Sequence, residues 1–356
     1  MVPFGGTRVA PVLGCAAAVA RPANRSYVFG VSNFLLRGHG SPRRAIATLA
    51  TGALVLLAGC SAGTDAGSAD APADDGRPVV LTTFTVLADM AENVAGEHLR
   101  VESITKVGAE IHGYEPTPGD VRKAADADLI LDNGMGLEAW FGRFVDGLDV
   151  PHVVVSEGVD PIPLGDDTAE EYQGKANPHA WMSPRNAQLY VRNMADAFAE
   201  LDPAHADDYA ANAAAYSAEI DAVHVELTGA LDALPESHRA LVTCEGAFPY
   251  LARDAGLTEK YLWAVNAEQQ ATPGSVVAAI EFVEENDVPA VFCESTVSDE
   301  SMRQVARESG AAFGGTLYVD SLSEPDGPVP TYLDLLRHDT DTIVAGLTGT
   351  AAEGDA

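Results

Sequence analysis

One stretch, from Asp202 to Leu234, constrains the fold more than any other part of this chain. Asp202 is a favourable N-cap, Pro203 stands where the first helical turn tolerates proline, and Pro235 ends the pattern. At about 1.5 Å per residue, a helix over this stretch would be about 50 Å long, longer than a small domain is wide. Its apolar residues recur every three or four positions, the period of one helix face: Tyr209, Ala213, Tyr216, Ile220, Val223, Leu227, Leu231 and Leu234.

A helix of this length either forms a coiled-coil arm or spans two domains. A coiled-coil arm needs a partner with its own heptad pattern, and the chain contains no second one. On both sides of the helix, short apolar segments alternate with helical ones. We therefore predict that residues 202–235 form a rigid helix that links two α/β lobes.

Short apolar strands that alternate with helices predict mainly parallel sheets flanked by helices. In such sheets, ligands bind beyond the carboxyl ends of the strands. The expected strands are 79–83, 101–104, 129–131, 153–155, 240–244, 261–264, 290–293 and 312–317. The expected helices are 86–94, 118–125, 137–145, 184–201, 248–255, 273–285, 298–308 and 331–347. The predicted organisation is a signal peptide (1–59), a flexible tether (60–77), an N-terminal α/β lobe (78–201), the linking helix (202–235), a C-terminal α/β lobe (236–347) and a disordered tail (348–356).

The first 59 residues differ from the rest of the chain. They contain six Arg and no Asp, Glu or Lys, and Arg43-Arg44 precede an apolar run over 45–58. That run is shorter than the about 20 residues of a membrane span, so it predicts a secretory signal peptide. Leu-Ala-Gly followed by Cys60 resembles the lipobox of bacterial lipoproteins, which implies lipidation of Cys60 and an extracytoplasmic protein anchored to the cell membrane. The sequence leaves open a twin-arginine export route and a translation start near Val31.

Beyond the leader, 53 acidic residues stand against 15 Lys and Arg. This charge excludes nucleic acid as a partner. The sequence does not decide between a salty habitat and a compositional bias as its origin. The sequence has no G-x-G-x-x-G fingerprint, no P-loop, no Cys-x-x-Cys pair and no Gly-x-Ser-x-Gly elbow between an expected strand and helix, so common phosphate and nucleophile chemistries have no visible motif.

Two potential metal ligands precede the long helix and two follow it. His112, His179, Glu245 and Asp320 each lie just past an expected strand or in a loop rich in Pro and Gly. Two neutral imidazoles and two carboxylates cancel the charge of a divalent ion, which lowers the cost of burying it. Each residue also has an ordinary alternative. For example, Glu245 can cap the helix expected near Phe248, and Asp320 can cap the segment after it.

Five motifs carry a resemblance to a known family. They are His112-Gly-Tyr-Glu-Pro-Thr-Pro-Gly-Asp, Asn177-Pro-His-Ala-Trp-Met, Cys244-Glu-Gly-Ala-Phe, Glu294-Ser-Thr-Val-Ser and Tyr318-Val-Asp-Ser-Leu-Ser. Over about residues 78–347 the chain resembles the cluster A-I metal-binding lipoproteins, the solute-binding proteins of bacterial ABC importers. The resemblance implies two α/β lobes joined by one rigid helix, with the metal in the cleft between them. It implies that His112, His179, Glu245 and Asp320 bind this metal.

The closing run that starts at Gly327 resembles the manganese and iron branch of this family. Zinc-uptake relatives usually have a His at the third ligand position and a His-rich acidic loop. This chain has Glu245 there, and its loop 164–176 contains no His. Carboxylates that bind through one or two oxygens suit Mn²⁺ or Fe²⁺, although intrinsic affinity favours Zn²⁺. Tyr114, Glu115 and Trp181 adjoin expected ligands and are candidates to orient them, with packing as the alternative for Trp181.

The resemblance implies capture of Mn²⁺, or Fe²⁺, and its delivery to an ABC permease and its ATPase by a monomeric protein that is not an enzyme. A zinc-binding lipoprotein of a zinc importer, or an adhesin on the same fold, is the alternative. A metallohydrolase is a further alternative, which would need an open coordination position and a general base. Of the four cysteines, Cys15 lies in the leader. Cys244 and Cys293 each end a strand-like run before a Glu, and the sequence leaves their pairing open.

Overall fold

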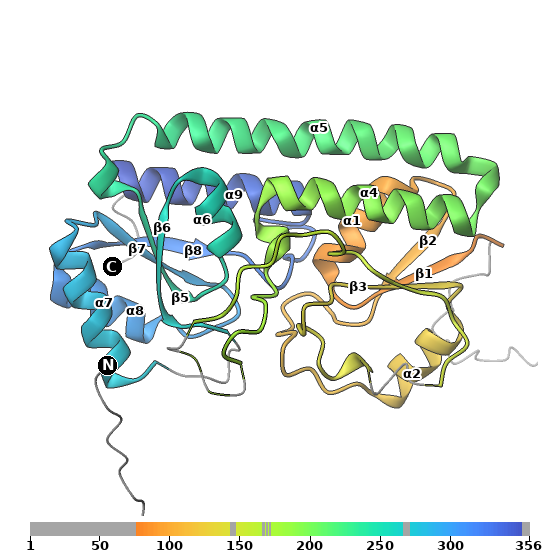
Figure 1. Cartoon of the computed structure of the whole chain (residues 1–356), viewed down its shortest axis with the longest axis horizontal. Helices are drawn as coiled ribbons and strands as arrows, with labels where there is room; N and C mark the ends of the chain where they lie inside the picture. Colours follow the sequence, from red (N-terminus) through yellow and green to blue (C-terminus); the bar gives the residue numbers. More distant parts are fainter. Residues whose placement is uncertain are drawn as a thin grey trace, which may run out of the picture. The chain divides into compact units, whose positions relative to one another are not determined.

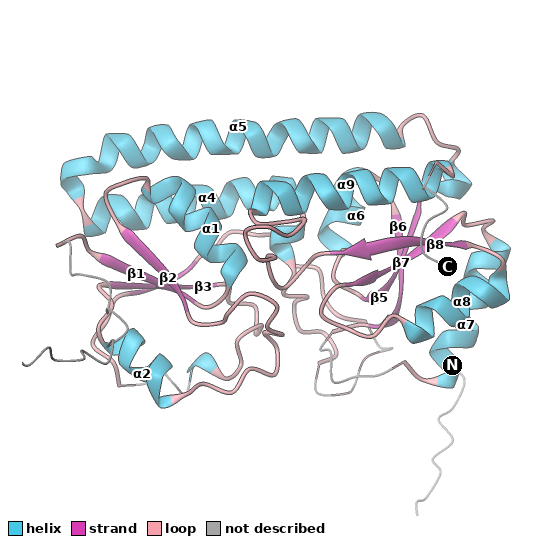
Figure 2. Cartoon of the chain, turned by 180° about the vertical axis from the view of Figure 1, so that it is seen from behind, coloured by secondary structure: helices cyan, strands magenta, loops and turns pink. Residues whose placement is uncertain are grey.

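The computed structural model describes residues 76–142, 147–165, 168, 170, 172–265 and 271–350. The predicted signal peptide, the Cys60 lipidation site, nearly all of the tether and most of the predicted tail lie outside these residues. Within them, strands and helices alternate along the chain, as Figures 1 and 2 show from opposite sides. No helix of the described part is both long and apolar enough to cross a membrane.

The first lobe contains a four-stranded parallel sheet in the order β2-β1-β3-β4. Its strands are β1 (Val79–Thr82), β2 (Arg100–Ser103), β3 (Leu129–Asp132) and β4 (His152–Val154). Its helices are α1 (Thr85–Ala95), α2 (Pro118–Ala125) and α4 (Pro184–Leu201). Helix α2 begins with a capping box between Thr117 and Asp120, and Ser183 caps α4 by accepting a hydrogen bond from the Arg185 N–H.

The second lobe contains two parallel pairs of strands. One pair is β5 (Ala240–Glu245) with β6 (Thr258–Trp263), and the other is β7 (Ala290–Glu294) with β8 (Ala312–Leu317). Strands β5 and β7 lie side by side and are joined by a disulfide between Cys244 and Cys293, which settles the pairing that the sequence left open. The helices are α6 (Pro249–Ala255), α7 (Pro273–Glu285), α8 (Glu300–Ser309) and α9 (Tyr332–Thr348).

The long helix follows a single 3₁₀ turn, Pro203–His205, and runs as α5 (Ala206–Leu231). It lies along both lobes, packing on α1 and α4 of the first and on α6 and α9 of the second (Figure 1). Every apolar residue of the predicted face within α5 is buried, as predicted. The helix ends earlier than the predicted residue 235. Its last turn tightens into i to i−3 hydrogen bonds, because Pro235 disfavours the helical conformation of Leu234.

The other predicted elements match the structure closely. All eight expected strands are present, and the bounds of α2, α4 and α7 are those expected from the sequence. The predicted helix 137–145 falls partly outside the described residues. Within them, only residues 141 and 142 have helical geometry. The α/β class with parallel sheets flanked by helices and one long helix is therefore confirmed.

One hydrophobic core continues from the first lobe into the second along α5. Phe84 of the first lobe packs against Trp181 with their ring centroids 5.1 Å apart. Tyr250 of α6 and Tyr332 of α9 belong to the same buried cluster. Because apolar packing is dense and changes in discrete steps, this shared core holds the two lobes in a defined arrangement around the loops between them.

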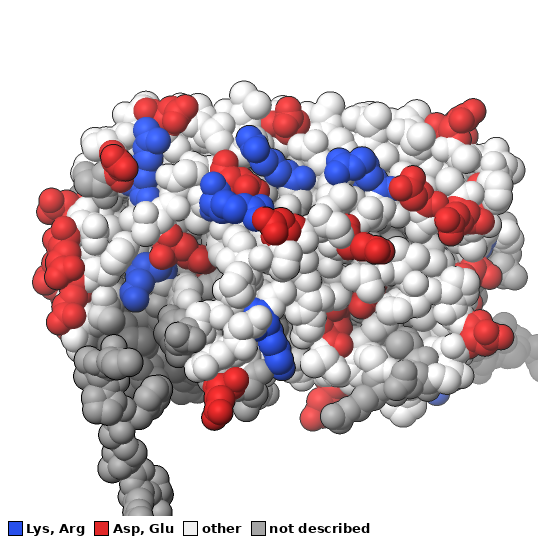
Figure 3. All heavy atoms as spheres, viewed as in Figure 1, with Lys and Arg blue, Asp and Glu red and all other residues white. Residues whose placement is uncertain are grey.

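Acidic side chains dominate the composition, and the surface reflects this. On the face in Figure 3, Asp and Glu residues are spread across the molecule, and Lys and Arg residues are interspersed among them. No continuous basic patch is visible on the described part of that face.

Candidate metal centre

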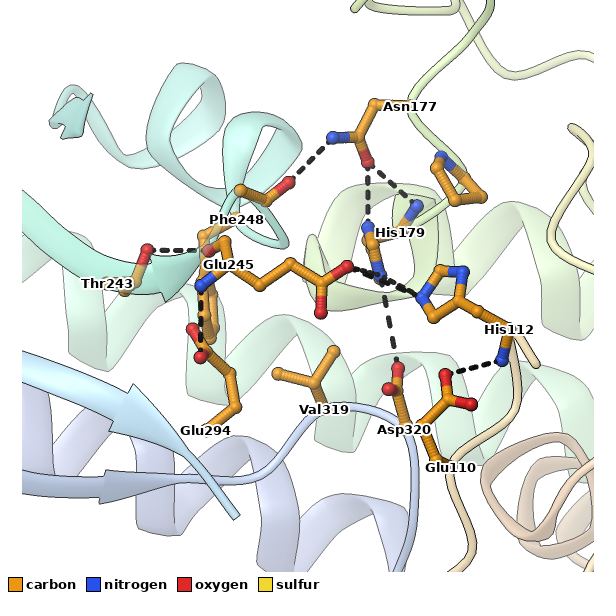
Figure 4. Close-up of polar contacts among 12 residues, drawn as sticks. Glu110, His112, Asn177, His179, Thr243, Glu245, Phe248, Glu294, Val319 and Asp320 are labelled. Atoms are coloured by element: carbon orange, nitrogen blue, oxygen red, sulfur yellow. Dashed lines mark hydrogen bonds and ion pairs between the residues drawn. The ribbon is translucent and has the colours of Figure 1, made fainter. Parts of the chain in front are cut away.

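The four predicted ligands converge, although they come from four separate loops or strand ends (Figure 4). The Nε2 atoms of His112 and His179 are 3.1 Å apart. Glu245 Oε1 lies 3.5 Å from the first of these atoms and 3.8 Å from the second. Asp320 Oδ1 lies 3.9 Å from His179 Nε2. Four side chains far apart in sequence thus direct nitrogen and oxygen atoms toward one small volume.

Each lobe supplies two of these side chains. His112 lies in the loop between β2 and α2, and His179 directly precedes the 3₁₀ turn Ala180–Met182. Glu245 is the last residue of β5, and Asp320 follows β8. The carboxyl ends of parallel strands are where such folds bind ligands. Glu245 and Asp320 therefore stand at the edge that the fold class predicts, and the two His residues reach it from loops.

The imidazoles are deeply buried, with 6% of the His112 side chain and 0% of the His179 side chain exposed. Burial lowers the pKa of His112 to about 4. Burial, and then the neighbouring His112, lower the pKa of His179 well below its usual range. Both rings are therefore neutral near pH 7, and each has a nitrogen lone pair for a metal.

The carboxylates are as deeply buried as the imidazoles, with 2% of each side chain exposed. Burial, and then the negative charge of Glu110, raise the pKa of Asp320 to about 7. Asp320 Oδ1 has no hydrogen-bond partner among the described residues. An unpartnered carboxylate oxygen facing two neutral imidazoles fits a divalent cation, which would neutralise the charge and fill the oxygen's bonding capacity.

Hydrogen bonds to the backbone hold the loops that carry these residues. Glu110 accepts hydrogen bonds from the N–H groups of His112 (2.7 Å) and Gly113 (2.8 Å). Glu294 accepts one from the Glu245 N–H at 3.1 Å. The sequence also allowed Glu245 to cap the helix near Phe248. In the structure the Phe248 N–H, at the start of α6, donates to Glu259 at 2.9 Å. The Glu245 carboxylate faces His112 and His179.

Asn177 and Trp181 flank His179 on the same loop. The Asn177 side chain accepts hydrogen bonds from both the N–H and the ring Nδ1 of His179, each at 3.0 Å. The Trp181 indole donates to the carbonyl of Val319, the residue before Asp320, at 3.1 Å. Its ring also packs on His179, with centroids 5.2 Å apart. Trp181 therefore packs on one predicted ligand, His179, and bonds to the residue before the other, Asp320, so it combines the two roles considered for it.

The other two residues considered as neighbours of the ligands lie elsewhere. The Tyr114 hydroxyl donates to Asp120 at 3.0 Å and belongs to the start of α2, and Glu115 is exposed to solvent. The supporting roles of Glu110, Asn177 and Glu294 were not predicted. Asn177 and Glu294 stand in the quoted motifs, but only the folded backbone shows which atoms they meet.

This arrangement defines a class of protein: a two-lobed α/β protein with a long connecting helix and a buried cluster of two His and two carboxylate side chains. The sequence matches the protein-family profile described as ZnuA, zinc-uptake complex component A, periplasmic, over residues 80–346. The chain belongs to this family, and the resemblance predicted from its motifs is confirmed.

Individual relatives support the same family. The iron-binding protein YfeA of Yersinia pestis is 49% identical over 268 residues, which cover 75% of this chain and 85% of that protein. The manganese-binding lipoprotein MntA of Halalkalibacterium halodurans is 36% identical over 296 residues, 83% of this chain and 95% of that protein. The Mn-bound periplasmic metal-binding protein of Candidatus Liberibacter asiaticus shares the fold, with a TM-score of 0.71 and 38% identity over 76% of this chain and 100% of that one.

Proposed function

We propose that this protein captures Mn²⁺, or Fe²⁺, outside the cytoplasm and delivers it to the permease of an ABC importer. The observation that carries the proposal is the convergence of His112, His179, Glu245 and Asp320 from both lobes in one buried cluster. In this proposal the ion is the transported substrate, and these four side chains bind it.

The donor set favours manganese and iron. Two carboxylates that each use one or two oxygens, together with two imidazole nitrogens, provide up to six donors. Their two negative charges balance a divalent ion in a buried site. The names of the relatives YfeA and MntA, iron-binding and manganese-binding, support this assignment.

Zinc is the second candidate. The family description is that of a zinc-uptake component, and four ligands satisfy a tetrahedral zinc ion. Intrinsic affinity also favours Zn²⁺ over Mn²⁺, so selectivity for manganese depends on coordination geometry and metal supply. The carboxylate of Glu245, in the position where the zinc branch usually has a His, favours the manganese and iron assignment.

The remaining parts of the proposal concern the anchor, the partners and the domains. We assign Cys60 as the lipidated N-terminus of the mature protein, with residues 60–77 as a tether to the membrane. The lobes extend over 78–201 and 236–347, with the linking segment 202–235 between them. The partners are a permease with its ATPase, and the protein acts as a monomer and without enzymatic turnover. The lipoprotein names of relatives such as MntA support the anchor.

Calorimetric titration of the purified protein with Mn²⁺, Fe²⁺ and Zn²⁺ tests this function. We expect one ion per chain for the parent. His112→Ala and Glu245→Ala should weaken all three ions strongly. Asp320→Ala should weaken Mn²⁺ severely and leave measurable Zn²⁺ binding, because zinc accepts three protein ligands and a water.

His152→Ala is a matched control. His152 forms a close pair with the carboxylate of Asp132, at 2.7 Å, outside the four-residue cluster. This variant should bind each ion like the parent. If Asp320→Ala binds Mn²⁺ like the parent, the four-residue site is wrong.

A further inference from the structure

Asn177 lies two residues before His179, and its side chain is almost completely buried, with 3% of the residue exposed. Its oxygen accepts hydrogen bonds from the backbone N–H of His179 and from the ring Nδ1, both at 3.0 Å. Its nitrogen donates to the carbonyl of Gly246 at 2.7 Å. Figure 4 shows the amide beside His179, with these contacts as dashed lines. The amide group thus has a partner at each end.

These contacts fix the orientation of the amide. A backbone N–H only donates and a backbone carbonyl only accepts, so Oδ1 faces the His179 N–H and Nδ2 faces Gly246. Because Oδ1 accepts only, the proton of the neutral His179 ring sits on Nδ1. Its Nε2 therefore has a free lone pair, and Nε2 is the atom that faces His112, Glu245 and Asp320.

The same amide links the two lobes. His179 belongs to the first lobe, whereas Gly246 directly follows Glu245 at the end of β5 in the second. A second bond joins the same two segments, from the Tyr250 hydroxyl of α6 to the Asn177 carbonyl at 2.7 Å. Gly246 sits tightly in its place, because a Cβ there would lie 2.8 Å from the Ala264 carbonyl oxygen. The backbone that receives the Asn177 amide is thus closely confined.

We propose that Asn177 is a positioning residue that sets the ring tautomer of His179 and couples the placement of His179 to that of Glu245 across the two lobes. The role requires an acceptor and a donor on one short side chain, which Asn provides. Asp at this position would keep the acceptor for His179 but would direct an oxygen at the Gly246 carbonyl oxygen. The part of the inference that concerns metal affinity rests on the proposed function, whereas the tautomer and the lobe contact belong to the metal-free protein.

The first test is ¹⁵N NMR of the imidazoles in the metal-free protein at pH 8, with His179 assigned by comparison with His179→Gln. The parent and Asn177→Asp should show a single Nδ1–H tautomer for His179, and Asn177→Ala should show a mixture of tautomers. Asn193→Ala is the matched control. Asn193 also donates its amide to two backbone carbonyls, those of Val155 (2.8 Å) and Glu157 (2.9 Å), but within the first lobe. It should leave His179 unchanged.

The second test combines hydrogen exchange of residues 243–248 with titration by Mn²⁺. Asn177→Ala should lose exchange protection in this segment and bind Mn²⁺ about 10- to 100-fold more weakly, the usual effect of removing a partner that orients a ligating His. Asn177→Asp should lose the protection but bind Mn²⁺ within a few-fold of the parent, because its carboxylate still orients the ring.

Several results would overturn the proposal. A parent-like tautomer in Asn177→Ala would remove the orienting role, and parent-like exchange in both variants would remove the coupling role. If the parent itself does not bind Mn²⁺, the proposed function fails. The tautomer and the exchange protection still decide the role of Asn177 in that case. If Asn177→Ala does not fold, both measurements are made on Asn177→Asp. For this variant the proposal predicts faster hydrogen exchange in residues 243–248 and the parent tautomer of His179.

Discussion

Replacing Asp320 with Asn removes one buried negative charge and preserves the size of the side chain. Burial, and then the charge of Glu110, raise the pKa of Asp320 from 3.8 to about 7 in the metal-free protein. A shift of about three pKa units corresponds to about 4 kcal/mol of destabilisation once the group is ionised. Because the folded-state pKa is the higher one, this cost is absent below the unfolded-state pKa and is complete once the pH has risen through about 7.

We therefore expect metal-free Asp320→Asn to be more stable than the parent at pH 8, by up to about 4 kcal/mol, and equally stable near pH 4. Urea denaturation in the presence of a chelator, between pH 4 and 8.5, measures the difference. Glu294 does not cancel fully in this comparison, because burial and, to a smaller extent, the charge of Asp320 raise its pKa to about 8, so part of the measured difference belongs to Glu294. Asp120→Asn is a control of opposite sign. Hydrogen bonds from Thr117 and Tyr114 outweigh burial and lower the pKa of Asp120, so losing its charge should destabilise the protein above pH 4.

Mn²⁺ should narrow this difference and, at more than about 1,000 times its dissociation constant, reverse the order of stability. A ligand at that excess stabilises the native state by about 4.1 kcal/mol, and only the parent retains the Asp320 carboxylate to bind it. If Asp320→Asn is no more stable than the parent at pH 8 without metal, the electrostatic reasoning is refuted. If Mn²⁺ stabilises both proteins equally, Asp320 is not a ligand.

Four further outcomes are expected. Cys60→Ala should release the mature chain into the medium or leave an unprocessed precursor, and unchanged membrane fractionation with its lipid label would contradict the anchor. Thiol labelling of unreduced, unfolded mature protein should find neither Cys244 nor Cys293 free. Changing both to Ala should lower the free energy of unfolding by about 2–4 kcal/mol, since the disulfide closes a loop with a sequence separation of 49. Val225 is 62% exposed on α5, so Val225→Pro should lower the free energy of unfolding by about 3 kcal/mol, whereas Val225→Ala should change it little. Because α5 is a stiff spacer, small-angle scattering of the parent should show no change of several ångströms in the radius of gyration when metal binds. Mn²⁺ affinity should fall about tenfold per pH unit below about pH 7, because the ion displaces one proton from Asp320, and a flat profile between pH 5 and 7 would exclude that exchange.

Local sequence patterns predicted most of the helices and strands. The face of α5 from Tyr209 to Leu231 follows from a 3.6-residue period, and that period depends only on neighbours within about one helical turn. Pro118, Pro184 and Pro273 each begin a helix at the position predicted from the sequence, because proline at the first turn is a local signal. The choice of His112, His179, Glu245 and Asp320 came from motif order and from their places beside strands and loops, which are also properties of the sequence.

Only the tertiary structure decided how these parts meet. Cys244 and Cys293 both end strands, but their bond required β5 and β7 to lie side by side, and such pairing depends on contacts between distant segments. The hydrogen bonds from Asn177 to His179 and Gly246 depend on the directions of side chains and carbonyls in two lobes. The pKa of Asp320 depends on burial, which no local pattern measures. Local patterns set the helices and strands because their energies act within a few residues, whereas the cluster exists because packing along α5 brings four distant loops together.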